Sequence, residues 1–131
     1  MMKWMSKIPL LLMVLFFSCA KPGSEEVILT TQITLQGTVM HHFWTVGSCK
    51  VYIKGNTTIY PGPQPSAYDS FTVADPGGTF IFSNLSPGYY YLFGKGYDPA
   101  WGDTVNGALF LNLQAHPGTH IELDTILNVS E

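Results

Sequence analysis

The fold is decided by residues 75–92, which read DPGGTFIFSNLSPGYYYL. Residues 75–78 and 86–88 are turn sequences, because Pro fixes its own backbone and Gly permits conformations that other residues avoid. Phe80 and Phe82 lie between these turns and share one face of an extended chain. The segment therefore predicts a short strand with one buried face, bounded on both sides by tight turns.

The same period-two alternation of apolar residues recurs along most of the chain, and turn sequences separate its stretches. The residues that share a buried face in each stretch are Ile33, Leu35 and Val39; Cys49, Val51 and Ile53; Phe71 and Val73; Phe80 and Phe82; Tyr90 and Leu92; Leu109, Leu111 and Leu113; and Ile121 and Leu123. We therefore expect an all-β domain over residues 30–131, built as a seven-stranded antiparallel β-sandwich. Its predicted core contains Val51, Ile53, Phe80, Phe82, Leu85, Tyr90, Leu92, Leu111 and Leu123.

Residues 75–92 also resemble the signature of carboxypeptidase-regulatory-like and collagen-adhesin B-type domains. In those domains a glycine turn leads to an aromatic-rich strand, an Asn-Leu-Pro-Gly-type corner and a Tyr-x-Leu strand. The resemblance implies a transthyretin-like, or prealbumin-like, sandwich and covers roughly residues 33–127. Such domains serve as spacers, stalks and binding modules, so the resemblance indicates a fold and not an activity.

Two chemistries found in this fold group lack their residues here. The isopeptide bond of collagen-adhesin repeats needs a Lys in the first strand and an acid after the Tyr-x-Leu strand. This chain has Thr34, Gln36 and Thr38 in the first position and Phe93-Gly94 in the second. Transthyretin-related hydrolases of hydroxyisourate use Arg, and this chain has none. Both activities are therefore unexpected.

The first residues predict export. Met1–Lys7 carries two lysines, and the apolar run Ile8–Phe17 is too short to span a bilayer stably. Ser18-Cys19 resembles the lipobox of bacterial lipoproteins, in which the peptidase cuts before a diacylglycerol-modified Cys. We expect residues 1–18 to be a lipoprotein signal peptide, Cys19 to be acylated and residues 19–29 to form a flexible tether. The alternative is ordinary secretory cleavage near Ala20.

The predicted location is the bacterial outer membrane, reached through the N-terminal lipid anchor. Residues 24–26 resemble the acidic patch that directs surface display in Bacteroidetes-type lipoproteins, although a solvated linker explains them equally well. If Cys19 carries lipid, Cys49 has no partner and packs as a small apolar residue. Otherwise an exported compartment would permit a Cys19–Cys49 disulfide.

Charge and composition exclude several classes of function. Charged residues make up 11% of the 131 residues, the net charge is −3, and all six basic residues are Lys. A nucleic-acid partner is therefore not expected. No Ser lies in a Gly-x-Ser-x-Gly context, so the sequence offers no catalytic residues, and no cofactor is implied.

The histidines and one acidic loop raise the question of a metal. Adjacent His41 and His42 would point to opposite sides of an extended chain, and Pro117-Gly118 forbids the helix that would bring His116 and His120 together. We therefore expect solvated histidines and no metal site. Asp98 and Asp103 flank a short loop and are an alternative, weaker candidate for binding Ca²⁺.

Aromatic residues exceed what a solvated sheet requires. With Tyr90 and Leu92 facing the core, alternation places Tyr89, Tyr91 and Phe93 on the outer face. We expect these rings, with Trp101 and Trp44 from neighbouring loops, to bind a glycan or a protein partner. The alternative is that the long loop at residues 56–67 folds over the stripe and buries it.

The sequence therefore predicts a non-enzymatic cell-envelope lipoprotein whose β-sandwich is a binding or structural module for a glycan or protein. A first alternative is an accessory subunit of an outer-membrane or surface complex that faces the periplasm. A second alternative is a small exported enzyme.

Overall fold

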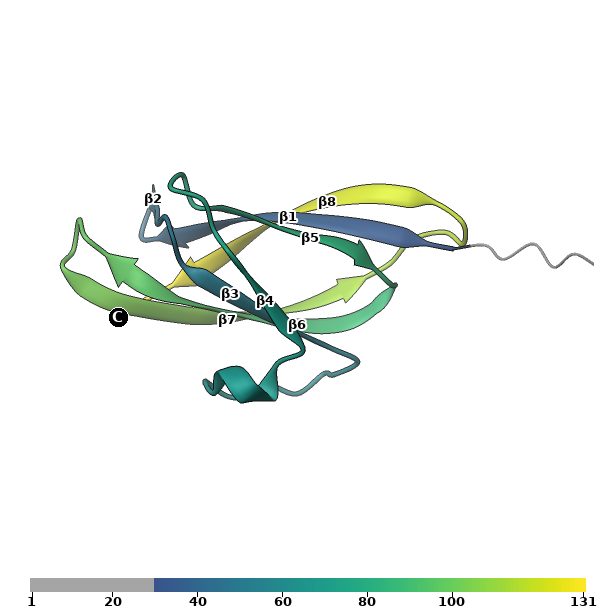
Figure 1. Ribbon diagram of the computed structural model, residues 1–131, viewed down its shortest axis with the longest axis horizontal. Helices are drawn as coiled ribbons and strands as arrows, with labels where there is room; N and C mark the ends of the chain where they lie inside the picture. Colours follow the sequence, from purple (N-terminus) through teal and green to yellow (C-terminus); the bar gives the residue numbers. More distant parts are fainter. Residues whose placement is uncertain (1–29) are drawn as a thin grey trace, which may run out of the picture.

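The computed structural model describes residues 30–131, which form two β-sheets packed face to face (Figure 1). The predicted signal peptide (1–18), the acylated Cys19 and the tether (19–29) lie outside these residues. None of the helical structure in the described part is long and apolar enough to cross a membrane.

One sheet is built around β1 (Gln32–His41) and is called the β1 sheet. β1 pairs antiparallel with β5 (Thr79–Leu85) and with the two-residue strand β2 (Trp44–Thr45). On its other edge, β1 pairs in parallel with β8 (His120–Val129) along its whole length. The first and last strands of the domain are therefore neighbours in the same sheet.

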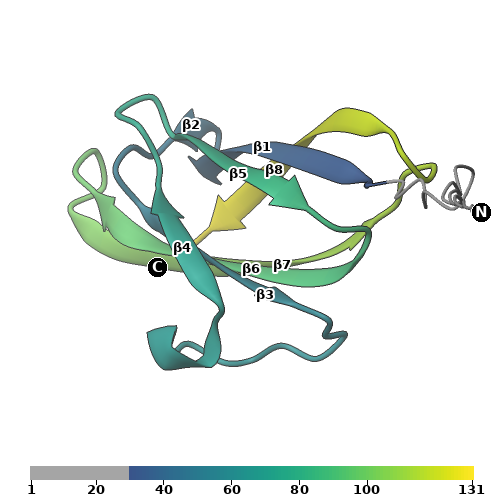
Figure 2. The same ribbon diagram turned by 45° about the vertical axis from the view of Figure 1, so that its right-hand side comes forward.

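The other sheet is built around β6 (Gly88–Asp98) and is called the β6 sheet. Its order is β4 (Ser70–Val73), β3 (Lys50–Gly55), β6 and β7 (Asp103–Leu113), with antiparallel pairing throughout. The connection from β3 to β4 contains a 3₁₀ turn, Pro65–Ala67. It lies on the outer side of this sheet, at the bottom of Figure 1. Figure 2 shows the two sheets as separate layers.

The prediction of an all-β sandwich is confirmed, and each of the seven expected stretches forms a strand. Two details differ. β2 is an additional short strand, and the pairing of β1 with β8 is parallel where we expected antiparallel sheets throughout. Parallel neighbours need a long crossover connection. Because β1 and β8 are the first and last strands, all the strands between them supply that connection.

The core lies between the sheets and follows the predicted alternation in every strand except β4. The expected buried residues Phe71 and Val73 are each 52% exposed, because the register pairs Phe71 with the outward-facing Tyr52, and the next residue, Ala74, is buried instead. Its buried members include Ile33, Leu35, Val39, Cys49, Val51, Ile53, Phe80, Phe82, Leu92, Val105, Leu113, Leu127 and Val129. Leu85, Tyr90, Leu111 and Leu123 are partly buried and pack against this cluster. Cys49 is fully buried, as expected of a small apolar residue, while its alternative partner Cys19 lies outside the described residues.

Glycines allow the last strand to close onto the β6 sheet. Gly94 of β6 lies opposite Gly107 of β7. A Cβ atom at Gly94 would lie 2.6 Å from the Cδ2 atom of Leu127, and one at Gly107 would collide with the backbone oxygen of Asn128. The end of β8 can therefore approach this closely only because both positions lack a side chain.

The closure is completed by backbone hydrogen bonds. The amide of Asn106 donates to the carbonyl of Ser130 at 2.9 Å, and the amide of Ser130 donates back to the carbonyl of Asn106 at 2.9 Å. These bonds join the end of the β1 sheet directly to β7 of the opposite sheet. They also fix the position of Glu131, the next residue.

We predict that Gly107→Ala destabilises the domain by about 1–3 kcal/mol, the usual range for an overpacked interior. The added methyl group must displace the backbone of Asn128, which cannot move aside as a flexible side chain could. Urea denaturation measures the change in the free energy of unfolding. The matched control is Gly77→Ala, whose Cβ would meet only the Asp75 carboxylate, at 3.4 Å. Equal stability of the two variants would contradict this account of closure.

Candidate functional site: an aromatic face and a histidine–carboxylate cluster

The outer face of the β6 sheet is covered by aromatic rings. Alternation directs Tyr89, Tyr91 and Phe93 outward from β6, as predicted, and the register places Tyr52 of β3 opposite Phe93 and Phe110 of β7 opposite Tyr91. A solvated sheet face would carry polar residues at these positions. Part of this aromatic surface must therefore be covered, by the chain itself or by a ligand.

The loop between β3 and β4 covers one half of this face. Tyr68 stacks on Phe93 with ring centroids 5.9 Å apart, and its hydroxyl donates to the carbonyl of Gly62 at 2.8 Å. Burial, with a smaller contribution from neighbouring tyrosines, raises the pKa of Tyr68 to about 12. Phe93 is only 2% exposed beneath Tyr60 and Tyr68. Its expected role in ligand contact is therefore corrected, and the alternative of a covering loop holds for this ring.

The other half of the face stays open to solvent. Tyr60, Tyr91, Phe110 and Tyr89 form a continuous series of ring contacts, here called the aromatic row. The successive centroid distances are 5.9, 5.5 and 6.0 Å. Tyr60 is 44% exposed, Phe110 39% and Tyr89 46%. Sequence reasoning identified Tyr89 and Tyr91 on the strand and Tyr60 as an aromatic residue of a loop, but it did not place Tyr60 beside Tyr91. It missed Phe110, which the strand register brings alongside.

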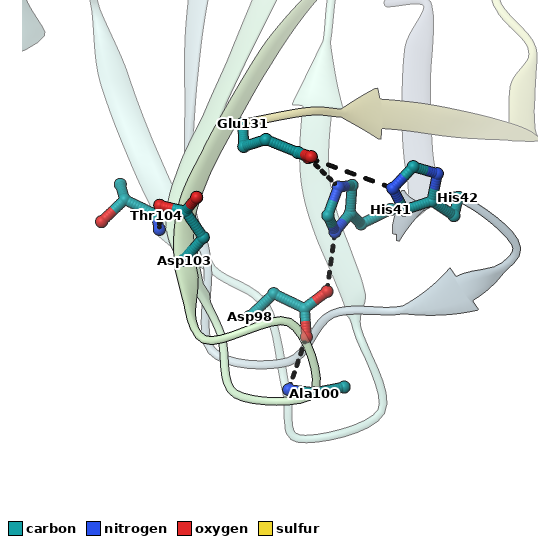
Figure 3. Close-up of polar contacts among 7 residues, drawn as sticks. All are labelled: His41, His42, Asp98, Ala100, Asp103, Thr104 and Glu131. Carbon is teal, nitrogen blue, oxygen red and sulfur yellow. Dashed lines mark hydrogen bonds and ion pairs between the residues drawn. The ribbon is translucent and has the colours of Figure 1, made fainter.

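A second group of side chains meets at one end of the sandwich and is called here the histidine–carboxylate cluster: His41, His42, Asp98 and Glu131 (Figure 3). His41 continues the buried face of β1 two residues beyond Val39, and Asp98 ends the inward face of β6. Glu131 lies two residues beyond Val129, the last residue of β8, and its side chain is 45% exposed. Polar groups at the ends of β1 and β6 and just beyond β8 thus meet at this end of the sandwich, with His41 and Asp98 buried and Glu131 partly exposed.

His41 is held on both sides. Its Nδ1 atom lies 2.8 Å from Oδ2 of Asp98, and its Nε2 atom lies 2.6 Å from Oε2 of Glu131. His41 is 1% exposed and Asp98 4%. Because both imidazole nitrogens contact carboxylates, neither remains free to activate a serine or cysteine nucleophile. The arrangement therefore stabilises an ion pair and does not form a catalytic triad.

The prediction that these histidines are solvated is wrong for His41, and the argument that adjacent histidines diverge fails at this position. His42 has φ +57°, so the chain is not extended where the argument assumed it to be. The two imidazole centroids lie 4.2 Å apart. The inward position of His41 was detectable from the alternation of Ile33, Leu35 and Val39, which it continues.

The two carboxylates raise the pKa of His41 above its ordinary value, with the Asp98 hydrogen bond as the largest cause and burial opposing it. The pKa of Asp98 is lowered chiefly by its hydrogen bond with His41. The pKa of Glu131 is lowered by a backbone hydrogen bond and by His41. All three directions favour an imidazolium between two carboxylates.

Trp44 and Trp101, expected beside the outer stripe, lie near the cluster instead. Trp44 pairs with His41 through β2 and is 69% exposed. Trp101 stands at the tip of the β6–β7 hairpin, with its ring centroid 4.4 Å from that of His42. Tyr89 and Tyr91 lie at the other end of β6. The two tryptophans therefore do not extend the aromatic row.

The alternative of a Ca²⁺ loop at Asp98 and Asp103 finds no support in the geometry. Asp98 accepts hydrogen bonds from His41 through Oδ2 and from the Ala100 amide, at 2.9 Å, through Oδ1. Asp103 instead accepts from the amide of Thr104 at 2.8 Å (Figure 3). The two carboxylates serve separate local contacts and do not converge on one position.

No protein-family model matches the chain, and no curated protein matches it. Among solved structures, a candidate carbohydrate-binding protein from Pseudomonas aeruginosa matches with 13% identity and a TM-score of 0.46, over 81% of this chain and 92% of that one. The major pilin subunit of Bacillus cereus matches with 12% identity and a TM-score of 0.46, over 79% of this chain and 30% of that one. Overlap at this level carries no argument about function.

We predict that the free energy of unfolding falls as the pH rises from the ordinary histidine pKa of 6.5 through the higher folded-state pKa of His41. A raised pKa in the folded state means that the His41 contribution is complete below the ordinary value of 6.5 and is lost as the pH passes through the folded-state pKa. Urea denaturation in EDTA-containing buffer measures the slope. It should flatten in His41→Gln, which keeps a donor for Asp98 and does not titrate. Equal slopes in both proteins would contradict the assignment.

Proposed function

We propose that this chain is an exported lipoprotein of the bacterial outer membrane whose β-sandwich is a non-enzymatic, carbohydrate-binding module. The observation that carries the binding proposal is the aromatic row, in which Tyr60, Phe110 and Tyr89 remain exposed although a long loop covers Phe93 on the same face. Tyrosine and phenylalanine rings supply large contact areas at a low cost in side-chain entropy. Flat apolar faces of sugar rings are suited to stack on such a row.

Polar groups accompany the row, as orientation of a sugar would require. Lys54 lies opposite Tyr91 in the register, and Asn112 lies opposite Tyr89. Lys54 pairs with Asp69 at 3.2 Å, so its ammonium group is held at the margin of the row. These side chains could exchange hydrogen bonds with sugar hydroxyl groups.

The row is also rigidly supported. Asp69 accepts a hydrogen bond from the Gly55 amide at 2.9 Å, and this bond fastens one end of the loop that carries Tyr60. Tyr91 is placed by the pairing of β6 with both β3 and β7. A platform that is already ordered loses little entropy when a ligand binds. The ordered geometry of the aromatic row therefore favours a role in ligand binding over a role in packing alone.

We predict that Tyr89→Ala weakens carbohydrate binding by about 1–3 kcal/mol, a rough scale taken from aromatic platforms that bind nucleobases. Tyr89 contacts Phe110 at the exposed end of the row, so its removal should leave the melting temperature nearly unchanged. The ligand is first identified on a glycan array and affinities are then measured by calorimetry. The matched control is Tyr97→Ala on the same strand, which is 57% exposed and outside the row.

Unchanged affinity in Tyr89→Ala would exclude the row as the binding site. Binding of a protein partner and of no glycan, lost in the same variant, would keep the site and replace the ligand class. Loss of stability without loss of binding would show that the row is structural.

Anchoring through Cys19 is supported by the apolar run at residues 8–17 and the adjacent Ser18-Cys19. Because β1 starts at Gln32 and runs to His41, a tether would join the end of the domain opposite the histidine–carboxylate cluster. Ten strand residues span about 33 Å. The cluster would thus lie at the end of the domain far from the point where the tether is attached.

We predict that Cys19→Ser is released from the membrane fraction as soluble protein, whereas the wild-type chain is extracted only with detergent. Mass spectrometry of the wild-type protein should show an acylated Cys at its N-terminus. A wholly soluble wild-type protein would contradict the anchor. Protease treatment of intact cells then distinguishes surface display from a periplasmic orientation.

A further inference from the structure

His41, His42 and Glu131 bring metal-binding atoms together at the end of the sandwich. One nitrogen from each imidazole and one carboxylate oxygen all lie within 4.8 Å of one another. Oε2 of Glu131 lies 2.6 Å from Nε2 of His41 and 4.0 Å from Nε2 of His42 (Figure 3). Glu131 lies 90 positions from His41 in the sequence. His42 follows His41 directly, but its imidazole reaches the same place only because the chain turns at His42. The fold therefore creates this grouping.

We propose that these three side chains bind one divalent transition-metal ion of the zinc type. Two imidazole nitrogens and one carboxylate oxygen suit Zn²⁺, Cu²⁺ or Ni²⁺. Ca²⁺ and Mg²⁺ take oxygen ligands and would be poorly served by two imidazoles. The inference concerns a surface separate from the aromatic row and does not depend on carbohydrate binding.

Asp98 supports His41 in the manner usual for a metal-ligating histidine. Its Oδ2 atom accepts the Nδ1–H group of His41 at 2.8 Å, and its Oδ1 atom is fixed by the amide of Ala100 at 2.9 Å. A carboxylate in this position holds the Nδ1 proton, so that Nε2 is the nitrogen that can bind an ion once it has lost its own proton. His41 is 1% exposed, so its ring direction is also fixed by packing.

His42 is held close by its backbone and by a neighbouring ring. Its φ of +57° turns the chain so that its imidazole returns to within 4.2 Å of that of His41. Such a backbone conformation is uncommon in residues other than glycine. Here it limits the directions in which the His42 side chain can point. Trp101 packs against the ring of His42 at 4.4 Å between centroids. The second nitrogen ligand is therefore partly oriented before an ion arrives.

Small movements would complete the site. Ligands 2.0–2.1 Å from a tetrahedral ion lie about 3.3 Å apart, so the 2.6 Å separation must widen and the 4.0 Å separation must shorten. Both changes can come from Glu131 and His42, whose side chains are each 45% exposed. Without an ion, a proton bridges His41 and Glu131, and this proton passes to solvent as the ion binds. Water would fill the remaining coordination position.

The test is a titration of the purified, EDTA-stripped protein with Zn²⁺, and separately with Cu²⁺ and Ni²⁺, by isothermal calorimetry. We expect one ion per chain and a rise in melting temperature, because the ion binds the folded state only. In nitrogen NMR spectra, the Nε2 signals of His41 and His42 should shift on addition of Zn²⁺, while those of His116 and His120 should not.

His42→Ala should weaken binding by about 100-fold or more, since losing even a supporting residue around a metal site costs about 10–100-fold. Glu131→Gln should also weaken it, and it retains the side-chain shape. The matched control is His116→Ala, an exposed histidine outside the cluster, which should bind like the wild type. Equal affinity of wild type and His42→Ala, or an equal loss in His116→Ala, would overturn the proposal and leave the cluster as an ion pair alone.

Discussion

The structure depends on the close approach of the end of β8 to the glycines of β6 and β7. Gly94 and Gly107 leave room for Leu127 and for the backbone of Asn128, respectively. Side chains at these positions would hold the sheets apart and break the backbone bonds that follow. Sheet-to-sheet spacing is normally about 10 Å. Here the sandwich narrows and closes at one end because two facing positions carry no side chain.

This closure also explains why polar residues meet inside the sandwich. The parallel pairing of β8 with β1 brings Glu131 to the same end as His41, and the long β6 strand delivers Asp98 to that end. Burying the charges of His41 and Asp98 separately would be costly, whereas pairing them with each other and with the partly exposed Glu131 offsets much of that cost. The cluster thus closes the end of the core beyond the buried side chains of Val39 and Val129.

The two candidate sites differ in how the fold produces them. The aromatic row lies on the regular surface of one sheet, where Tyr89, Tyr91 and Phe110 follow from strand alternation and register. The cluster lies where separate strands end, and it needs the left-handed conformation of His42. The surface of a sheet offers a broad, flat area of contact. The ends of several strands instead bring a few chemically different side chains close together. A stacking ligand suits the former and a small ion suits the latter.

The sequence by itself determined the strands and, except in β4, their buried faces, because alternation is a local property that each strand carries alone. It placed Phe80, Phe82 and Leu92 correctly in the core, and it put Tyr89 and Tyr91 outside. Only the tertiary structure decided that the loop covers Phe93 and that the first and last strands run in parallel. The convergence of His41, Asp98 and Glu131 followed from that pairing. Contacts between residues 57 and 90 positions apart depend on which strands become neighbours, and local alternation does not specify this.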